Sequence, residues 1–350
     1  DLGFKQLQQT AGRSELESAD GLDELVDHQL LTNGNQYRFN HDLIHQVTYQ
    51  SLNPWRCQLL HRRAAEALLD LHRHQEDEFA AIIAQHFDTA GEVHKASQYY
   101  YRAAIYARSL YAHEEAIDYL QSAVNLASEI ASGWDEITQL YELLGDSLKI
   151  TGQYEVARQV YSDLLDQIPE GEYIYRVKYE TKLADIYENL NLLTKAEQGY
   201  DEALMLLNEH PDHQDLAWQQ TWLEVHLERW GLFYLLAESK KMQALQEEIK
   251  PILDKAGRPD QRLRYYSNYV STAMRHERYA VSEQTVRIAE SRLQAEMETS
   301  DPARIANAKF HWGFVSLWSG DLVGAVQPLS EALDLAEETG RVVLQLRCLV

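Results

Sequence analysis

The pair His41-Asp42 carries the most specific chemistry in the sequence, because it falls where a helix is expected to begin. The unpaired N–H groups and positive dipole end of a helix N-terminus favour an anion such as phosphate, and a histidine adds a hydrogen-bond donor. Asp42 is favourable at the same end and can accept a hydrogen bond from a local N–H group. The local alternative is that Asn40 caps the helix, Asp42 complements its dipole and His41 is an ordinary surface residue.

No other constellation in the sequence indicates catalysis or metal binding. The phosphate-binding pattern G-x-x-x-x-G-K-[ST] is absent, so the chain cannot hold or hydrolyse ATP by that route. The patterns G-x-S-x-G and H-E-x-x-H are absent as well. His41 and His45 stand four residues apart, but no cysteine ligands accompany them, which favours solvated or capping histidines. We therefore expect no enzyme activity, no cofactor and no metal in this chain.

The charge of the chain argues against nucleic acid and membrane surfaces as direct partners. The 350 residues include 32 Lys and Arg against 55 Asp and Glu, a net charge of −23, and a negative field repels phosphate backbones and anionic lipids. No apolar run of about 18 residues and no leader peptide occur, so we expect a cytoplasmic protein. Cys57 and Cys348 are too few for a disulfide framework, which favours a reducing compartment.

Most of the chain repeats one pattern of small and large residues. Starting from Gly145, the pattern places Leu148, Ala157, Tyr161 and Leu164 at offsets +3, +12, +16 and +19. Small residues at 0 and +12 let two antiparallel helices approach closely, whereas a large residue at +16 fills the space between successive pairs. The sequence therefore predicts an all-α array of helix pairs. The same offsets recur from Ala84, Ala104, Ala184, Val270 and Gly313.

This spacing resembles the tetratricopeptide repeat, whose features are all present in LGDSLKITGQYEVARQVYSDLLDQIP. The anchors recur about 40 rather than 34 residues apart, and one unit fits only with a residue inserted in its turn. The resemblance implies a right-handed superhelix over 76–350, truncated at the C-terminus. We expect a helix near 77–90 and then pairs at 93–110/113–129, 134–151/154–167, 174–190/193–208, 215–237/240–255, 260–276/280–298 and 304–319/322–338.

Residues 20–75 lack the repeat and predict a small winged-helix module, whereas 1–19 are expected to be a linker or the end of an upstream domain. GLDELVDHQLL predicts a helix, and Asn33-Gly34 predicts a tight hairpin turn. A second helix is expected after Asn40 and a third from Pro54. Because 40–52 contain no Lys or Arg, the sequence argues against DNA reading.

The order of a winged helix followed by repeats resembles the C-terminal part of bacterial STAND-type signal-transduction ATPases, similar to those linked to LuxR-type regulators or nucleotide cyclases. The resembling stretches are YRFNHDLIHQVTYQSL and IAQHFDTAGEVHKASQYYYRAA. The resemblance implies that His41 contacts the β-phosphate of ADP, that Asp42 orients the local turn, and that ATP or ADP is bound by an upstream domain. Asn40 stands where the family motif has Met. Since the chain starts at Asp1 without Met, we expect a piece of a larger protein.

In tetratricopeptide arrays the first helix of each pair lines a groove. Transferred to this chain, that geometry predicts a polar and rather acidic groove, which favours a basic or mixed peptide, a partner protein, a small-molecule inducer or a neighbouring domain over a free carboxylate. Trp218, Trp222 and Trp230 are either core residues or a ligand-facing wall. The predicted groove residues are Gln139, Glu142, Asp146, Lys149, Lys178, Thr181, Asp185 and Glu188.

Together these features predict the sensor and protein-interaction arm of a signalling ATPase or transcriptional regulator, in which an inducer or partner controls a nucleotide switch. The alternative is a free-standing tetratricopeptide-repeat scaffold or adaptor that binds a peptide or protein. A catalytic site hidden in the groove is the third hypothesis.

Overall fold

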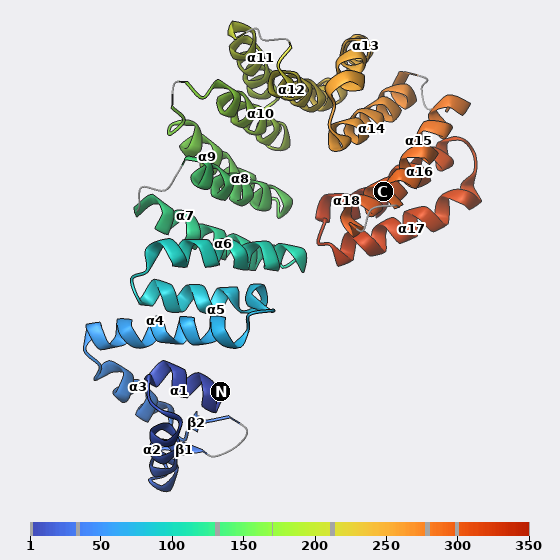
Figure 1. Cartoon of the computed structure of the whole chain (residues 1–350). Coiled ribbons are helices and arrows are strands. Elements are labelled where there is room, and N and C mark those ends of the chain that lie inside the picture. The colour runs from blue at the N-terminus through green and yellow to red at the C-terminus, as the bar shows by residue number, and fades with distance from the viewer. Residues whose placement is uncertain are drawn as a thin grey trace. The chain divides into compact units, whose positions relative to one another are not determined.

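The computed structural model describes residues 3–32, 36–129, 134–169, 171–210, 214–276, 281–297 and 301–349. These residues form helices and one two-stranded sheet (Figure 1). The chain divides into two compact units, 1–144 and 145–350. The all-α class is therefore confirmed, and the winged-helix boundary predicted near residue 76 stays a prediction.

The first unit begins with short elements and continues as packed helices. Ser14 caps α2 in a capping box with Glu17, and Asn53 caps α4 directly before Pro54, so local sequence fixes both starts. The helices α4, α5, α6 and α7 pack in succession (Figure 1). The elements are α1 (Phe4–Ala11), α2 (Glu15–Asp27), β1 (Leu31–Thr32), β2 (Arg38–Phe39), α3 (Asp42–Gln50), α4 (Pro54–Leu71), α5 (Glu76–Thr89), α6 (Val93–Ser109) and α7 (His113–Glu129), and α8 (Trp134–Ile150) spans the division.

The predicted hairpin is present as the antiparallel pair β1 and β2. Leu31 pairs with Phe39, and Thr32 pairs with Arg38. The predicted turn at Asn33-Gly34 lies outside the described residues. Helix, hairpin and helix thus follow in the predicted order, whereas the winged-helix assignment stays a prediction.

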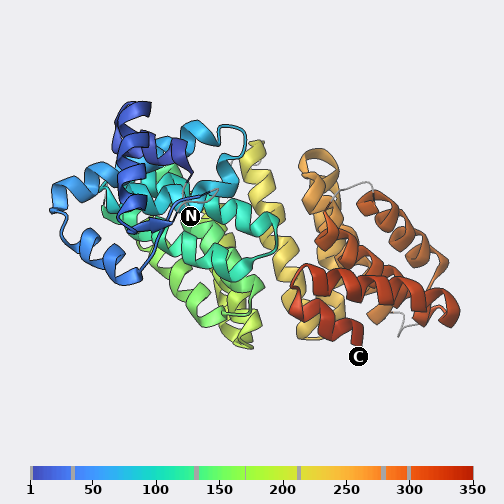
Figure 2. The ribbon, with the colours of Figure 1, turned by 90° about the horizontal axis from the view of Figure 1, so that it is seen from below.

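The second unit consists of helix pairs whose bounds differ from the predicted ones by three residues or fewer. In its C-terminal part, α15, α16, α17 and α18 pack in succession (Figure 1, Figure 2). The elements after α8 are α9 (Tyr154–Leu165), α10 (Tyr173–Asn189), α11 (Leu193–Glu209), α12 (Leu216–Leu235), α13 (Ser239–Ala256), α14 (Pro259–His276), α15 (Glu283–Met297), α16 (Pro302–Trp318), α17 (Leu322–Glu338) and α18 (Val342–Leu349).

The repeat offsets correspond to direct contacts between the two helices of a pair. A Cβ atom at Gly145 would lie 2.4 Å from the Tyr161 ring, and one at Gly313 would lie 2.6 Å from Leu329 Cγ. At these two positions the absence of a Cβ atom lets the offset +16 residue approach closer than it could to an alanine. The turn at Gly152 has a positive φ of 79°, as expected where one helix ends before its partner begins.

The tryptophans of α12 belong to the core of the second unit. Trp218, Trp222 and Trp230 are 2%, 7% and 1% exposed, and they pack with α10, α11, α13 and α14 residues. The indole N–H of Trp218 donates to the Leu207 carbonyl at 3.0 Å, and that of Trp230 donates to the Thr272 hydroxyl at 2.8 Å. Core packing therefore accounts for the stripe.

Candidate functional site

The predicted groove residues divide between the two units. Gln139 and Glu142 lie in the first unit, and the other six lie in the second. Six of the eight are half-buried, Gln139 is exposed and Thr181 is buried. Each unit therefore presents its own candidate surface.

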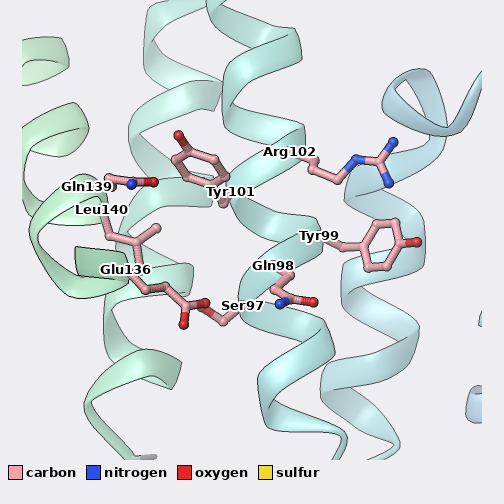
Figure 3. Close-up of a pocket in the computed structure, with 8 residues that line it drawn as sticks. All are labelled: Ser97, Gln98, Tyr99, Tyr101, Arg102, Glu136, Gln139 and Leu140. Carbon is pink, nitrogen blue, oxygen red and sulfur yellow. The ribbon is translucent and has the colours of Figure 1, made fainter. Parts of the chain in front are cut away.

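In the first unit, Gln139 lines a small pocket of about 330 Å³ between α6 and α8 (Figure 3). Arg102 lies on its α6 wall and bonds α5 carboxylates, with Nη1 2.6 Å from Glu76 Oε2. Ser97 uses its hydroxyl to donate to the Ala123 carbonyl at 3.2 Å. The remaining lining residues are Gln98, Tyr99, Tyr101, Glu136 and Leu140. This pocket is small, and its buried polar groups are engaged within the helix array.

In the second unit, α8 and α10 are joined by two ion pairs. Lys182 Nζ lies 2.7 Å from Asp146 Oδ1, and Lys149 pairs with Asp185. Asp146 also accepts a hydrogen bond of 2.6 Å from the Tyr161 hydroxyl. Burial opposes ionisation of Asp146, but Lys182 and Tyr161 outweigh it and hold the pKa of Asp146 below its usual value.

Thr181 does not belong to this surface, which corrects the prediction. Its side chain is 2% exposed, and its hydroxyl donates to the Val177 carbonyl one turn earlier at 2.7 Å. The next residue, Lys182, takes the place that the repeat spacing assigned to Thr181 and pairs with Asp146. Lys178 lies one turn before Lys182 on α10 and is half-buried.

Two carboxyl groups on the surface formed by α8, α10 and α12 have raised pKa values. Burial, together with the neighbouring charges of Asp185 and Glu228, raises the pKa of Glu188 to about 8. The Tyr200 hydroxyl donates to Glu188 at 2.7 Å and partly offsets the shift. Burial also raises the pKa of Glu228, although Arg264 opposes that shift.

Helices α12 and α14 extend the surface with residues that the sequence reading missed. Arg264 Nη1 lies 2.7 Å from Glu224 Oε1 and 2.6 Å from Glu228 Oε1. Arg258 Nη2 lies 3.0 Å from Glu224 Oε2, and the Gln261 amide donates to the same oxygen at 3.0 Å. Glu224 and Glu228 could have been found from the sequence, because they are four residues apart and therefore lie one turn apart on the first helix of the pair α12 and α13. We call Asp146, Lys149, Lys182, Asp185, Glu188, Glu224, Glu228 and Arg264 the charged face.

His41 and Asp42 lie at the start of α3, as predicted, but the capping differs. His41 is itself the N-cap residue and makes no side-chain cap bond, and Asp42 is in the first turn. The predicted cap, Asn40, instead donates its amide to the Gln29 carbonyl, because it follows β2 directly. Both His41 and Asp42 are exposed.

Two classes of site are absent from the part of the chain that the structure describes. No group of three or more His, Cys, Asp or Glu residues there could hold a metal ion. No helix there is both long and apolar enough to cross a bilayer.

A scan against protein-family models and a search of curated proteins find no match. Solved structures do share the fold. The apo form of RapI is 8% identical with a TM-score of 0.56, and the alignment covers 96% of this chain and 86% of that chain. The apo quorum sensor NprR from B. thuringiensis is 14% identical with a TM-score of 0.51, covering 94% of this chain and 86% of that chain. At these identities the likeness shows a tetratricopeptide-like helical-repeat fold and nothing further.

A STAND protein with a tetratricopeptide repeat sensor, PH0952 from Pyrococcus horikoshii, also aligns. It is 12% identical with a TM-score of 0.48, covering 97% of this chain and 48% of that chain. That TM-score is too low to support a conclusion about this chain. The STAND resemblance therefore rests on the sequence stretches alone.

Proposed function

We propose that this chain is the partner-binding arm of a signalling protein, and that the charged face of its second unit binds a basic or mixed-charge peptide or protein segment. NprR, a protein of the same fold, is named a quorum sensor, so the fold serves elsewhere to sense a signal. The chain itself is proposed to have no catalytic role and no cofactor of its own.

The raised pKa values of Glu188 and Glu228 carry this proposal. Burial is the main cause of both raised pKa values and neighbouring carboxylates add to it, so the cations of the face do not fully offset the cost of ionising these groups. Lys149 and Arg264 are each already shared between carboxylates of the face. A lysine or arginine from a guest would supply the missing charge, whereas a free carboxylate would be repelled.

A peptide array tests the binding preference. The purified chain should select peptides rich in Lys and Arg with blocked C-termini, and Glu188→Gln combined with Glu228→Gln should reduce their retention about tenfold. Glu209→Gln, an exposed carboxylate change on α11, should leave retention unchanged. Selection of acidic peptides, or equal retention by both variants, would contradict the proposal.

We further infer that the chain acts within a STAND-type ATPase, where His41 contacts the β-phosphate of ADP and Asp42 orients the turn. Both residues are exposed at a helix start, where an anion is favoured. The same helix exposes Leu43 and Val47 at 69% and 58%, which leaves apolar surface for a neighbouring domain. The effector would be a LuxR-type regulator or a nucleotide cyclase.

This inference is tested in the natural polypeptide purified from its source. His41→Ala should lower the fraction of molecules that retain ADP in native mass spectrometry and raise basal activity. His74→Ala changes an exposed histidine that follows α4 and should change neither quantity. If His41→Ala leaves ADP retention at the level of His74→Ala, the nucleotide switch is excluded.

A further inference from the structure

A second pocket in the C-terminal part of the second unit has a chemistry opposite to that of the charged face. It encloses about 750 Å³ and is lined from α12, α14, α16, α17 and α18. Cavities of roughly 300–1,000 Å³ suit small organic ligands. This volume therefore fits one small molecule.

Aromatic and aliphatic side chains form most of the pocket wall. They come from helices that are distant in sequence, so the pocket exists only in the folded unit. A few polar groups are interspersed, including the amide of Asn268, which donates to the Leu227 carbonyl at 3.0 Å. The apolar lining includes Trp230, Phe310, Phe314, Leu317, Trp318 and Leu329.

The charged groups at this pocket are cationic. Arg347 lines the pocket and lies over the Phe310 ring, with its guanidinium carbon 4.4 Å from the ring centroid. No Asp or Glu lines the pocket, and Arg347 has no ion-pair partner among the residues that the structure describes. Arg347 is exposed, so its N–H donors are open to a ligand, and a guanidinium beside apolar walls favours an anion.

A second arginine reinforces the positive charge. Arg292 of α15 is 9% exposed, and its Nε and Nη1 atoms have no hydrogen-bond partner within the described ranges. Burial, with a smaller contribution from the charge of Arg347, lowers the pKa of Arg292 to about 10. Glu296, which partly offsets the burial of Arg292, is itself paired with Arg304 at 3.0 Å.

His311 is a further polar residue of the pocket wall. It lines the cavity, and burial depresses its pKa well below the usual value. The charges of Arg292 and Arg347 both depress it further. His311 is therefore neutral near pH 7 and offers a hydrogen-bonding nitrogen rather than a third charge.

We propose that this pocket binds a small amphipathic organic anion, with an aromatic or aliphatic body against Phe314, Leu317 and Trp318 and a carboxylate bonded to Arg347. The guanidinium binds a carboxylate through paired N–H donors, and the carboxylate relieves the mutual repulsion of Arg347 and Arg292. The single carboxylate matches a pocket with one lining arginine. This site takes a ligand of the opposite charge to the basic guest, and it adjoins the charged face where Gly231 of the pocket wall lies beside Glu188.

The test uses the 350-residue chain and two probes that differ only in charge, 2-naphthylacetate and 2-naphthylacetamide, in isothermal titration calorimetry. The acid should bind about tenfold more tightly than the amide, which corresponds to one charge-assisted hydrogen-bonded contact. Arg347→Gln should remove this preference. Arg287→Gln replaces an arginine of α15 that is 78% exposed and does not line the pocket, and it should keep the preference.

The outcomes separate the alternatives. The proposal is supported if the natural chain prefers the acid, Arg347→Gln loses this preference and Arg287→Gln keeps it. Equal binding of acid and amide would show an apolar cavity without an anion site, and no binding of either probe would show no ligand site; both overturn it. If Arg347→Gln fails to fold, as circular dichroism would reveal, the comparison of acid and amide on the unchanged chain still decides.

Discussion

Glu188 shows how one side chain links the charged face to stability. Its carboxyl is held among Tyr200, Asp185 and Glu228 with a pKa raised from 4.5 to about 8. The folded state therefore keeps a proton that the unfolded chain releases as pH rises through this window. Stability of the second unit consequently falls between about pH 4.5 and 8 because of this group.

Glu188→Gln should remove that loss, because the amide mimics the protonated carboxyl at every pH. We expect the variant to be more stable than the natural chain by about 1–3 kcal/mol near pH 8, with little difference at pH 5. Urea unfolding at the two pH values measures the difference. Glu209→Gln is the control and should shift the unfolding curves at the two pH values equally. A change in stability by Glu188→Gln that is the same at both pH values would contradict the raised pKa of Glu188.

Gly145 tests the repeat packing at the same scale. Gly145→Ala places a Cβ atom 2.4 Å from the Tyr161 ring, so the ring must move and its hydrogen bond to Asp146 is disturbed. We expect a net loss of about 1–3 kcal/mol in the free energy of unfolding, despite the better helix propensity of alanine.

The control for this change is Gly231→Ala, a helical glycine in the same unit. Its added Cβ would meet only Glu188 Oε2 at 3.4 Å, an ordinary contact distance. This variant should unfold at the same temperature as the natural chain or at a higher one, as thermal unfolding measures. Equal losses for the two alanine variants would show that the contact of Gly145 with Tyr161 is not the cause.

At the scale of elements, α4 and α5 meet through a pair of histidines. His61 Nδ1 and His86 Nδ1 are 2.9 Å apart, and the Tyr49 hydroxyl of α3 lies 2.9 Å from His61 Nε2. Burial lowers the pKa of both rings, and the charge of His61 lowers that of His86 further. Since the unfolded chain binds protons more readily than the folded one, stability is lost as pH falls below about 6.5.

His86→Gln should weaken this acid sensitivity, because the amide still bonds His61 but does not titrate. Hydrogen exchange of α4 and α5 at pH 5 and pH 7, corrected for intrinsic rates, measures the effect. The natural chain should lose more protection at pH 5 than the variant does. The exposed His74→Gln serves as control, and identical pH dependence in all three chains would rule out the pair as the cause.

The helix pairs could be predicted because each buries small residues at a fixed spacing, and that spacing is written in the sequence. Even the inserted turn residue of the fourth pair was predictable, and Ala237 there has a positive φ of 60°. The exposed face of α10 could be predicted less well. An error of one residue along the helix places Thr181 on the charged surface in place of Lys182. The contribution of α12 was missed because the pair α12 and α13 departs from the repeat, and that of α14 because the groove was transferred only to the two preceding pairs.

The start of α3 shows a second limit of sequence reading. Asn40 has the residue type of an N-cap, but its amide is taken by the Gln29 carbonyl after the hairpin. This contact joins residues eleven positions apart, so local preference alone could not reveal it. His41 became the N-cap instead, and its exposure was predictable only as one of two alternatives.

At the scale of the whole molecule, the net charge of −23 is not spread uniformly. Within the second unit, the charged face holds five carboxylates and three cations, whereas the pocket beside α18 is lined by Arg347 and by no carboxylate. The first surface suits a basic guest and the second suits an organic anion. The two sites can therefore be tested separately by ligands of opposite charge.

The most direct test of the central proposal is calorimetric titration of a blocked, array-selected basic peptide at pH 7 in two buffers of different ionisation enthalpy. The guest's cation should lower the pKa of Glu188, so binding should release up to about one proton per complex. Glu188→Gln should abolish that release. Binding without proton release, or release that persists in Glu188→Gln, would contradict the account of the charged face.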